Sequence, residues 1–249
     1  MLASGNATSP IGCLRPQPRA LERLVCFAHA GGGPAVYRKW PEALAPDVEL
    51  WAATLPGRAM RSDEPFATAW EPLVTSFADQ LEPGDGQAPP ALLGHSLGGL
   101  LAFEVARELE RRGVVPRHVF VSGCRPPHRV LTGAPLPDGD DALVDDVDQR
   151  YGAVPPAVRA EPELLRRFVP VLRADLELAA AYAWDDGERL ECPLTALSGM
   201  ADKTAPPREV AHWAAHASGP FQHLAMRGAH FFNHSELAGV ATVIRRALA

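Results

Sequence analysis

ALLGHSLGG, residues Ala91–Gly99, is the stretch that decides the fold of this chain. Its apolar start predicts a buried strand, which ends abruptly in a Gly-x-Ser-x-Gly pattern. A strand that stops at so tight a turn and continues as a helix lifts the serine hydroxyl out of the sheet. Gly94 and Gly98 leave room where a Cβ atom would crowd the turn. The stretch therefore predicts an exposed, nucleophilic hydroxyl on Ser96.

The flanks of this stretch help to separate a nucleophile elbow from an ordinary glycine-serine loop. Pro89 and Pro90 end a loop and begin the strand. Residues 99–113 carry apolar side chains at helical spacing on one side and charged side chains on the other, and Gly113 is a typical helix stop. The pattern favours the elbow of a serine hydrolase, with a loop before an amphipathic helix as the alternative.

Strands and helices alternate along the rest of the chain. Apolar segments predict further strands at 24–28, 48–53, 118–122, 194–198 and 221–226. Helical patterns lie at 35–44, 70–81, 208–216 and 237–249. This alternation is typical of an α/β fold, in which helices cover both faces of a mostly parallel sheet. With 249 residues, the chain fits one α/β domain over residues 1–249, and the elbow at Ser96 makes the α/β-hydrolase fold the expected one.

The longest segment without a predicted strand lies between residues 122 and 194, and within it the candidate lid spans about residues 125–186. A connection of this length in a compact domain carries helices of its own, so we expect a helical lid inserted in the domain. The aspartates between 138 and 148 predict a solvated helix face. Residues 162–184 have apolar side chains at helical spacing, with Pro170 able to kink the helix. The side chains expected to line a substrate channel are Leu164, Phe168, Leu172 and Leu176.

A serine hydroxyl needs a base, and the base needs a carboxylate that fixes its tautomer. In α/β-hydrolases the acid and then the histidine follow the serine along the chain. Asp202 and His230 each follow a predicted strand directly, at the strand ends where α/β sheets build their sites. The predicted triad is Ser96, Asp202 and His230. Other aspartates and histidines could serve as the acid or the base, but their positions are less favourable. They are Asp185, Asp186, His212, His216, His223 and His234.

Acyl transfer also requires donors for the oxyanion that forms in the transition state. The backbone N–H of Leu97, directly after the nucleophile, is one predicted donor. The glycine-rich loop at 29–33 follows an early strand and can bring a second amide close, and we expect it to be that of Ala30. A phosphate-binding loop is disfavoured, because neither G-x-G-x-x-G nor G-K-[ST] is present.

Composition limits the class of function. A net charge of −6 disfavours a nucleic-acid-binding protein, which would carry a basic face. The four cysteines show no C-x-x-C spacing and predict free thiols. No apolar run reaches the roughly 18 residues of a membrane span, and the first twelve residues show no signal-peptide pattern. We expect a cytoplasmic monomer that uses no metal or cofactor and binds neither nucleic acid nor membrane.

Several stretches together are far more specific than the elbow alone. They are FAHAGG at 27–32 with Tyr37, Arg38 and Trp40, LPGR at 55–58, GHSLG at 94–98, FVPVLRAD at 168–175 and GAHFF at 228–232. With these stretches the chain resembles type II thioesterases, the free-standing editing hydrolases of polyketide synthases and nonribosomal peptide synthetases. It departs from the usual family residues at Ala28, Ala59, Leu97 and Gly99, none of which is a reacting group.

The resemblance implies the substrate and the partner. It points to hydrolysis of acyl groups from the phosphopantetheine arm of acyl or peptidyl carrier proteins, through an acyl-serine intermediate. The resemblance also maps the triad onto Ser96, Asp202 and His230. Because carrier proteins are typically acidic, basic side chains near the site are candidates for docking, although ordinary surface or structural charge explains them equally well. These candidates are Arg38, Lys39, Arg58 and Arg61.

Two other functions remain open at the level of sequence. A carboxylesterase or lipase would use the same triad on oxygen esters. A non-catalytic protein that binds carriers on a hydrolase scaffold is a further alternative, which typically lacks a triad member. The chain length of the acyl group is not specified by any of these patterns.

Overall fold

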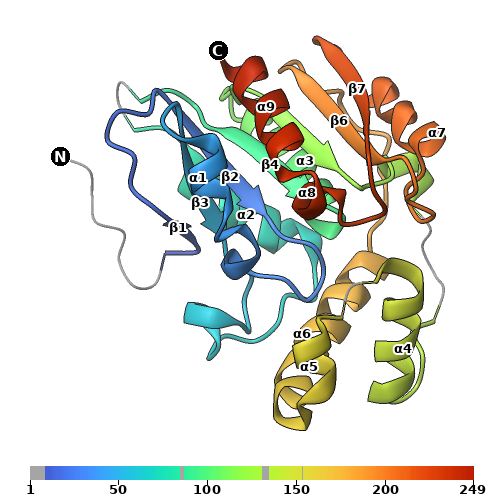
Figure 1. Ribbon diagram of the computed structural model, residues 1–249. Helices are drawn as coiled ribbons and strands as arrows, with labels where there is room; N and C mark the ends of the chain where they lie inside the picture. The colour runs from blue at the N-terminus through green and yellow to red at the C-terminus, as the bar shows by residue number, and fades with distance from the viewer. Residues whose placement is uncertain (1–8, 85–86, 131–134, 153) are drawn as a thin grey trace.

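The computed structural model describes residues 9–84, 87–130, 135–152 and 154–249. Within them, seven strands form one sheet in the order β1-β3-β2-β4-β5-β6-β7 (Figure 1). The strands are β1 (Ile11–Cys13), β2 (Glu22–Phe27), β3 (Val48–Ala53), β4 (Ala91–His95), β5 (Val119–Ser122), β6 (Leu194–Gly199) and β7 (Phe221–Met226). The mostly parallel sheet with flanking helices confirms the predicted α/β-hydrolase fold.

The sheet is parallel except at one edge, where β1 runs antiparallel to β3. The central strands β4 and β5 are buried along their whole length, as expected for strands that are covered on both faces. Because β2, β4, β5, β6 and β7 are parallel, their carboxyl ends meet at one edge of the sheet. The loops that follow these strands are therefore brought together there.

Two groups of helices cover the two faces of the sheet. On one face, α1 (Trp40–Leu44) and α9 (Leu237–Leu248) pack against β2, β3 and β4 through a buried apolar cluster. On the other face lie α2 (Trp70–Leu81), α3 (Leu97–Arg111), α7 (Pro207–Val210) and the 3₁₀ helix η4 (Ala211–His216). Short elements complete these layers, namely η1 (Pro34–Tyr37), η2 (Ala59–Arg61), η3 (Pro127–Arg129) and α8 (Phe232–Ser235).

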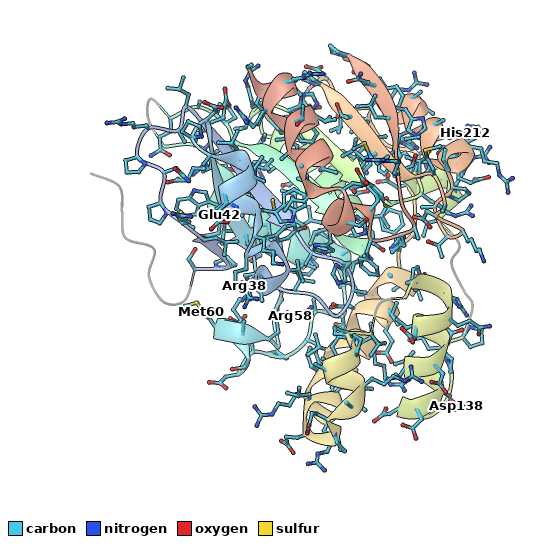
Figure 2. The ribbon with its side chains drawn as sticks, in the orientation of Figure 1. Arg38, Glu42, Arg58, Met60, Asp138 and His212 are labelled. Atoms are coloured by element: carbon cyan, nitrogen blue, oxygen red, sulfur yellow. The ribbon has the colours of Figure 1, made fainter. Side chains whose placement is uncertain are left out.

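The segment between β5 and β6 forms a separate group of helices at the end of the sheet, which we call the helical insertion (Figure 1). It comprises α4 (Asp140–Tyr151), α5 (Pro156–Ala160) and α6 (Pro162–Ala180), which has Pro170 within it. A small apolar cluster of its own includes Leu143, Val147 and Leu172. The aspartates at the start of α4 are exposed, and Asp138 lies at the end far from the sheet (Figure 2). Residues 131–134 and 153 of the predicted lid lie outside the described residues.

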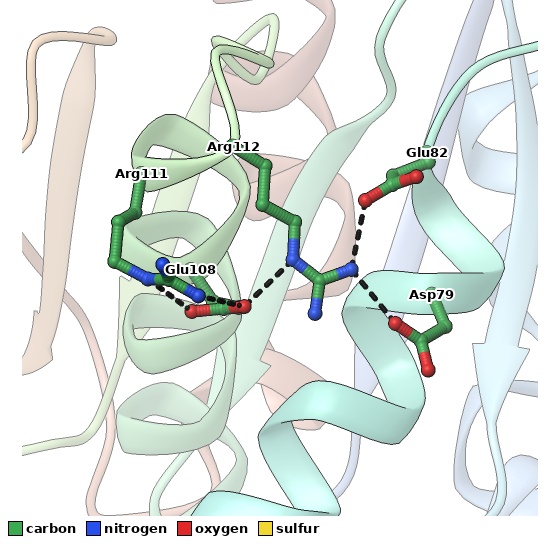
Figure 3. A network of polar contacts seen from close by, with 5 residues as sticks. All are labelled: Asp79, Glu82, Glu108, Arg111 and Arg112. Atoms are coloured by element: carbon green, nitrogen blue, oxygen red, sulfur yellow. Dashed lines mark hydrogen bonds and ion pairs between the residues drawn. The ribbon is translucent and has the colours of Figure 1, made fainter.

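A charged network joins α2 to α3 on the surface (Figure 3). The guanidinium of Arg112 donates hydrogen bonds to Asp79 and Glu82, each at 2.7 Å, and to Glu108 at 2.6 Å. Arg111 contacts Glu108 alone within this network. The network therefore ties the ends of two helices that are far apart in the sequence.

The structure differs from the sequence-based expectation in short elements. The helix expected at 35–44 is divided into η1 and α1, because Pro41 lies near the start of the second piece. The helix expected at 208–216 is likewise divided into α7 and η4. The edge strand β1 was not predicted, since three residues give no usable periodicity. All four cysteines are free thiols, and no described helix is long and apolar enough to cross a membrane.

Candidate active site

Ser96 lies at the turn between β4 and α3 with φ 55° and ψ −121°. Such a conformation costs about 1–3 kcal/mol for a residue other than glycine, so the surrounding structure must hold it. The backbone N–H of Ser96 donates to the carbonyl of Ser122 at 2.8 Å, which ties the turn to β5. A Cβ on Gly94 would lie 1.8 Å from the carbonyl oxygen of Gly98, and a Cβ on Gly98 would lie 2.1 Å from that of Phe27. The two glycines are therefore required by close backbone packing.

Asp202 lies in the loop that follows β6 and is buried. Its Oδ2 accepts a hydrogen bond from Nδ1 of His230 at 2.8 Å. Its Oδ1 accepts three more, from the Thr204 backbone N–H at 2.8 Å, the Thr204 hydroxyl at 2.7 Å and the Ala205 N–H at 3.0 Å. Burial alone raises the pKa of Asp202, but the hydrogen bond and charge interaction with His230, together with these donors, lower it to about 2. The side chain is therefore a carboxylate at neutral pH.

His230 follows β7 and is also buried, with Gly228 at φ +111° allowing the loop to turn. Because Nδ1 donates to Asp202, the neutral ring keeps Nε2 as a hydrogen-bond acceptor. The ring of Tyr151, at the end of α4, lies 4.9 Å from that of His230, and the ring of His95 lies 5.0 Å away. His230 is thus held between the sheet and the helical insertion.

Three of the rival residues have partners outside the Asp202–His230 pair. His223 contacts Ser198 at 2.9 Å, His216 contacts His128 at 2.6 Å, and the exposed Asp185 pairs with Arg107. His234 lies in α8, with its ring 6.3 Å from that of His29. Among the candidates of both types, the structure brings together Asp202 and His230.

A cavity of about 400 Å³ lies where the carboxyl ends of the strands meet the helical insertion. Ser96 and His230 both line it, although no hydrogen bond joins their side chains over the described residues. Catalytic hydrogen bonds are often long in unliganded enzymes and shorten when substrate binds. The cavity is lined largely by apolar side chains, among them Leu100, Val130, Leu136, Val147, Leu172 and Leu176.

Ala30 and Leu97 lie on the wall of the same cavity. Neither backbone N–H donates a hydrogen bond to another group in the described part of the chain. Leu97 is the first residue of α3, where N–H groups lack partners within the helix. Ala30 and Leu97, whose N–H groups have no partner among the described residues, therefore border the cavity that Ser96 lines.

The four channel residues expected on α6 are placed differently from one another. Leu172 and Leu176 line the cavity. Leu164, near the start of the helix, is 44% exposed and is not part of the cavity wall. The ring of Phe168 lies against Gly31, where an added Cβ would approach it to 2.9 Å, and it too is absent from the wall. Only the later turns of α6 reach the cavity, so Leu164 and Phe168 lie outside its wall.

The predicted docking residues also divide into two pairs. Arg38 and Lys39 are exposed. Arg58 is buried in an ion pair with Asp175, between the sheet layers and the helical insertion (Figure 2). Arg61 donates to the carbonyl of Thr54 and pairs with Glu64, so it fixes its own loop. Arg58 therefore has the structural role that was the alternative to docking, and its partner is 117 residues away, beyond the reach of local patterns.

Sequence reasoning missed three residues that shape the site, namely Thr204, Tyr151 and Asp175. The Asp-x-Thr spacing of Asp202 and Thr204 is a recognisable turn pattern, in which the carboxylate bonds the backbone two residues on. Tyr151 and Asp175 come from the helical insertion, and no local signal links them to the sheet. The described residues hold no cluster of three or more His, Cys, Asp or Glu side chains suited to a metal ion.

Comparison with known proteins gives a consistent result. The sequence model of the thioesterase domain family matches residues 22–248. Thioesterase PikA5 of Streptomyces venezuelae is 38% identical over 87% of this chain and 77% of its own length. A probable cadicidin biosynthesis thioesterase of Streptomyces griseus is 36% identical over 91% of this chain, which spans 62% of that protein.

Solved structures agree with the sequence matches. RedJ, a thioesterase of the prodiginine pathway in Streptomyces coelicolor, superimposes with a TM-score of 0.85 at 37% identity, covering 94% of this chain and 88% of that one. YbtT, the type II thioesterase of the yersiniabactin NRPS/PKS pathway, gives a TM-score of 0.84 at 30% identity, covering 96% and 98% of the two chains.

Proposed function

This chain belongs to the thioesterase domain family and is a thioesterase, and from that premise we propose that it removes acyl groups from the phosphopantetheine arm of carrier proteins. Its relatives include type II thioesterases of mixed nonribosomal peptide and polyketide pathways. Such pathways hold their intermediates as thioesters on carrier proteins, so a carrier-bound acyl group is the expected substrate. Oxygen esters are the less favoured alternative.

The observation that carries the proposal is the buried Asp202–His230 pair in the cavity that Ser96 lines. In the proposed mechanism Nε2 of His230 takes the hydroxyl proton of Ser96 while Oγ attacks the thioester carbonyl. Asp202 holds the neutral histidine in the tautomer that leaves Nε2 free, and it stabilises the imidazolium that forms. Its depressed pKa supports this role, because the carboxylate stays charged throughout.

The negative charge on the carbonyl oxygen requires donors that are already in place. The free N–H groups of Ala30 and Leu97 are suited to this task, and removing one such donor typically costs about 2.7–4 kcal/mol of transition-state stabilisation. The carbon–sulfur bond then breaks and the pantetheine thiol leaves, taking the proton from His230. A thiol with a pKa near 8.5 leaves readily.

Hydrolysis of the acyl-Ser96 intermediate completes the cycle. His230 takes a proton from water, the resulting hydroxide attacks the acyl carbon, and Ser96 Oγ leaves with the proton. The apolar wall formed by Leu172 and Leu176 supports an acyl chain bound between the elbow and α6. In this proposal the helical insertion acts as the lid of the acyl-binding chamber.

The direct test is hydrolysis of a panel of acyl-carrier proteins by the wild type and by Ser96→Ala. We expect the variant to lose at least about 10⁴-fold in turnover, because nucleophile and base act as a unit. Ser218→Ala is the matched control, since that hydroxyl bonds Leu190 far from the cavity. Retained turnover in Ser96→Ala would contradict the mechanism, and faster cleavage of matched oxygen esters by the wild type would favour an esterase.

A further inference from the structure

Asp175 and Arg58 form an ion pair that the proposed mechanism does not use. The two guanidinium contacts measure 2.5 and 2.6 Å, and the side chains are only 4% and 9% exposed. Burying two charges costs several kcal/mol in desolvation, and a packed apolar pair is often at least as stable. A contribution to stability is therefore a poor explanation for this pair. The two side chains also make other hydrogen bonds.

These hydrogen bonds are made with backbone groups of the loop that carries Ala30. Asp175 Oδ2 accepts a hydrogen bond from the Gly31 N–H at 2.7 Å. Arg58 Nη1 donates to the carbonyl of Gly32 at 2.9 Å. The ion pair thus holds the backbone at two points directly after Ala30.

The loop needs outside support of this kind. Gly31, Gly32 and Gly33 are consecutive, and Gly31 has φ +77°, a conformation that glycine adopts readily. A run of three glycines has high conformational freedom, and ordering it costs about 1–2 kcal/mol per residue. The Gly31 N–H belongs to the peptide that follows Ala30, so its bond to Asp175 fixes the orientation of Ala30 itself.

The same contacts connect the loop to the helical insertion. Asp175 lies on α6, directly before the cavity residue Leu176 and three residues after Leu172. Phe168 and Leu172 of α6 also pack against the face of Gly31. Ala30 packs against the apolar cluster of the insertion. Any movement of α6 away from the sheet therefore removes the acceptor for the Gly31 N–H.

We propose that Asp175 and Arg58 are positioning residues, which hold the Ala30 N–H in place for the oxyanion and do so only while α6 is docked. This inference rests on the proposed role of Ala30 in the oxyanion hole. Neither side chain needs to touch the reacting atoms. Lid closure and completion of the oxyanion hole then become one event, so a substrate that closes the lid also completes the site.

The test compares two double variants from which the buried charges have been removed. The asparagine form combines Arg58→Met with Asp175→Asn and keeps an amide oxygen that can accept a hydrogen bond from the Gly31 N–H. The leucine form combines Arg58→Met with Asp175→Leu, which has a similar volume and no acceptor. Neither leaves an unpaired buried charge, so both are expected to fold. We expect kcat for acyl-thioester hydrolysis to be about 30-fold to 100-fold lower in the leucine form than in the asparagine form, with KM within about threefold.

Two binding measurements separate positioning from general damage. A trifluoromethyl ketone analogue forms an oxyanion on Ser96, and its affinity is expected to fall in the leucine form by the same factor as kcat/KM. A thioether analogue without the carbonyl is expected to bind both forms equally. Arg173→Met is the matched control, since Arg173 also lies on α6 but contacts only Asp140 and the backbone of the insertion.

Hydrogen exchange of the peptide covering residues 28–38 provides a readout that does not depend on activity. We expect faster exchange in the leucine form than in the asparagine form. Equal exchange, or equal kcat in the two forms, would overturn the inference. If the wild type did not hydrolyse acyl thioesters, the proposed function would be contradicted instead. The hydrogen-exchange comparison would still decide whether the ion pair holds the loop.

Discussion

Thr204 is the residue that gives Asp202 most of its support apart from His230. Its backbone N–H and its hydroxyl both donate to the same carboxylate oxygen, and the hydroxyl also lies 3.1 Å from Nδ1 of His230. Hydrogen bonds to a charged group contribute about 1.5–3 kcal/mol each. The hydroxyl therefore helps to fix the carboxylate in the plane that His230 requires.

Thr204→Val tests this support, because valine has nearly the same shape and keeps the backbone donor. We expect kcat/KM for thioester hydrolysis to fall about tenfold, since Asp202 loses one charge-assisted bond and its orientation. Thr242→Val is the control, as that hydroxyl bonds the carbonyl of Ala238 within α9. An unchanged kcat/KM in Thr204→Val would show that the backbone donors and His230 suffice.

At the scale of residues, the sequence indicated those candidates whose side chain suits catalysis and whose position is at the end of a predicted strand. Ser96 was predicted from its elbow, and Asp202 and His230 from their places after strands. The Asp202–His230 contact bears out the expected proximity of these two, while their catalytic roles remain a proposal. The pairing of Asp175 with Arg58 was not predicted, because the two residues lie more than a hundred positions apart. A long-range ion pair leaves no trace in local periodicity.

At the scale of elements, Arg112 joins α3 to α2 through three carboxylates (Figure 3). An isolated surface ion pair contributes about 0–1 kcal/mol, whereas a network around one well-fixed arginine exceeds a single pair. The Arg112 side chain is 20% exposed and that of Arg111 is 68% exposed, although both contact Glu108. The two neighbours offer an internal comparison between a bridging and a peripheral arginine.

We expect Arg112→Met to lower the free energy of unfolding by about 1–2 kcal/mol and Arg111→Met to leave it nearly unchanged. Urea unfolding monitored by circular dichroism measures both. Because the contacts lie at the surface, the difference between the variants should shrink in 1 M salt, where the Debye length is about 3 Å. Equal losses in the two variants would show that the link between α2 and α3 adds nothing.

Long amphipathic or apolar elements were predicted well, and short ones were not. The bounds of α2 and β3 match the expected 70–81 and 48–53, because each has a clear period over its whole length. The divided helices near Trp40 and Ala211 depend on proline and on 3₁₀ geometry, which tertiary packing selects. The docking of α6 on the glycine loop depends on contacts with residues far away in the sequence, and the insertion was predicted only as helical.

At the scale of the whole molecule, several buried histidines make stability depend on pH. Burial lowers the pKa of His29 to about 3, aided by the nearby His234 and His230. Burial likewise lowers the pKa of His118 and of His216 to about 4, aided by neighbouring cationic groups. An unfolded chain protonates these rings near pH 6.5, whereas the folded protein keeps them neutral. Below pH 6.5 the unfolded state therefore binds more protons, and acid favours unfolding.

We expect the free energy of unfolding to decrease as the pH is lowered from about 6.5 to about 4. Each such histidine contributes up to about 1.4 kcal/mol per pH unit to this decrease. His118→Gln removes one of these groups, whose Nε2 contacts Thr195. Urea unfolding at several pH values should show a slope smaller by about 1.4 kcal/mol per pH unit in the variant, whatever its stability at pH 7.5. Identical slopes would show that His118 does not stay neutral in the folded state.

The place of the helical insertion has a consequence for how such enzymes diversify. β5 and β6 are direct neighbours in the sheet, with Val119 opposite Leu194, and the described residues between them add no strand to it. Because the entropic cost of closing a loop grows slowly with its length, the connection between β5 and β6 tolerates inserted segments, or cassettes, of different length. A chimaera that exchanges the cassette would change the acyl chamber and keep the reactive machinery. It must still carry a carboxylate at the position of Asp175, or the transplanted chamber would be joined to a glycine loop without an anchor.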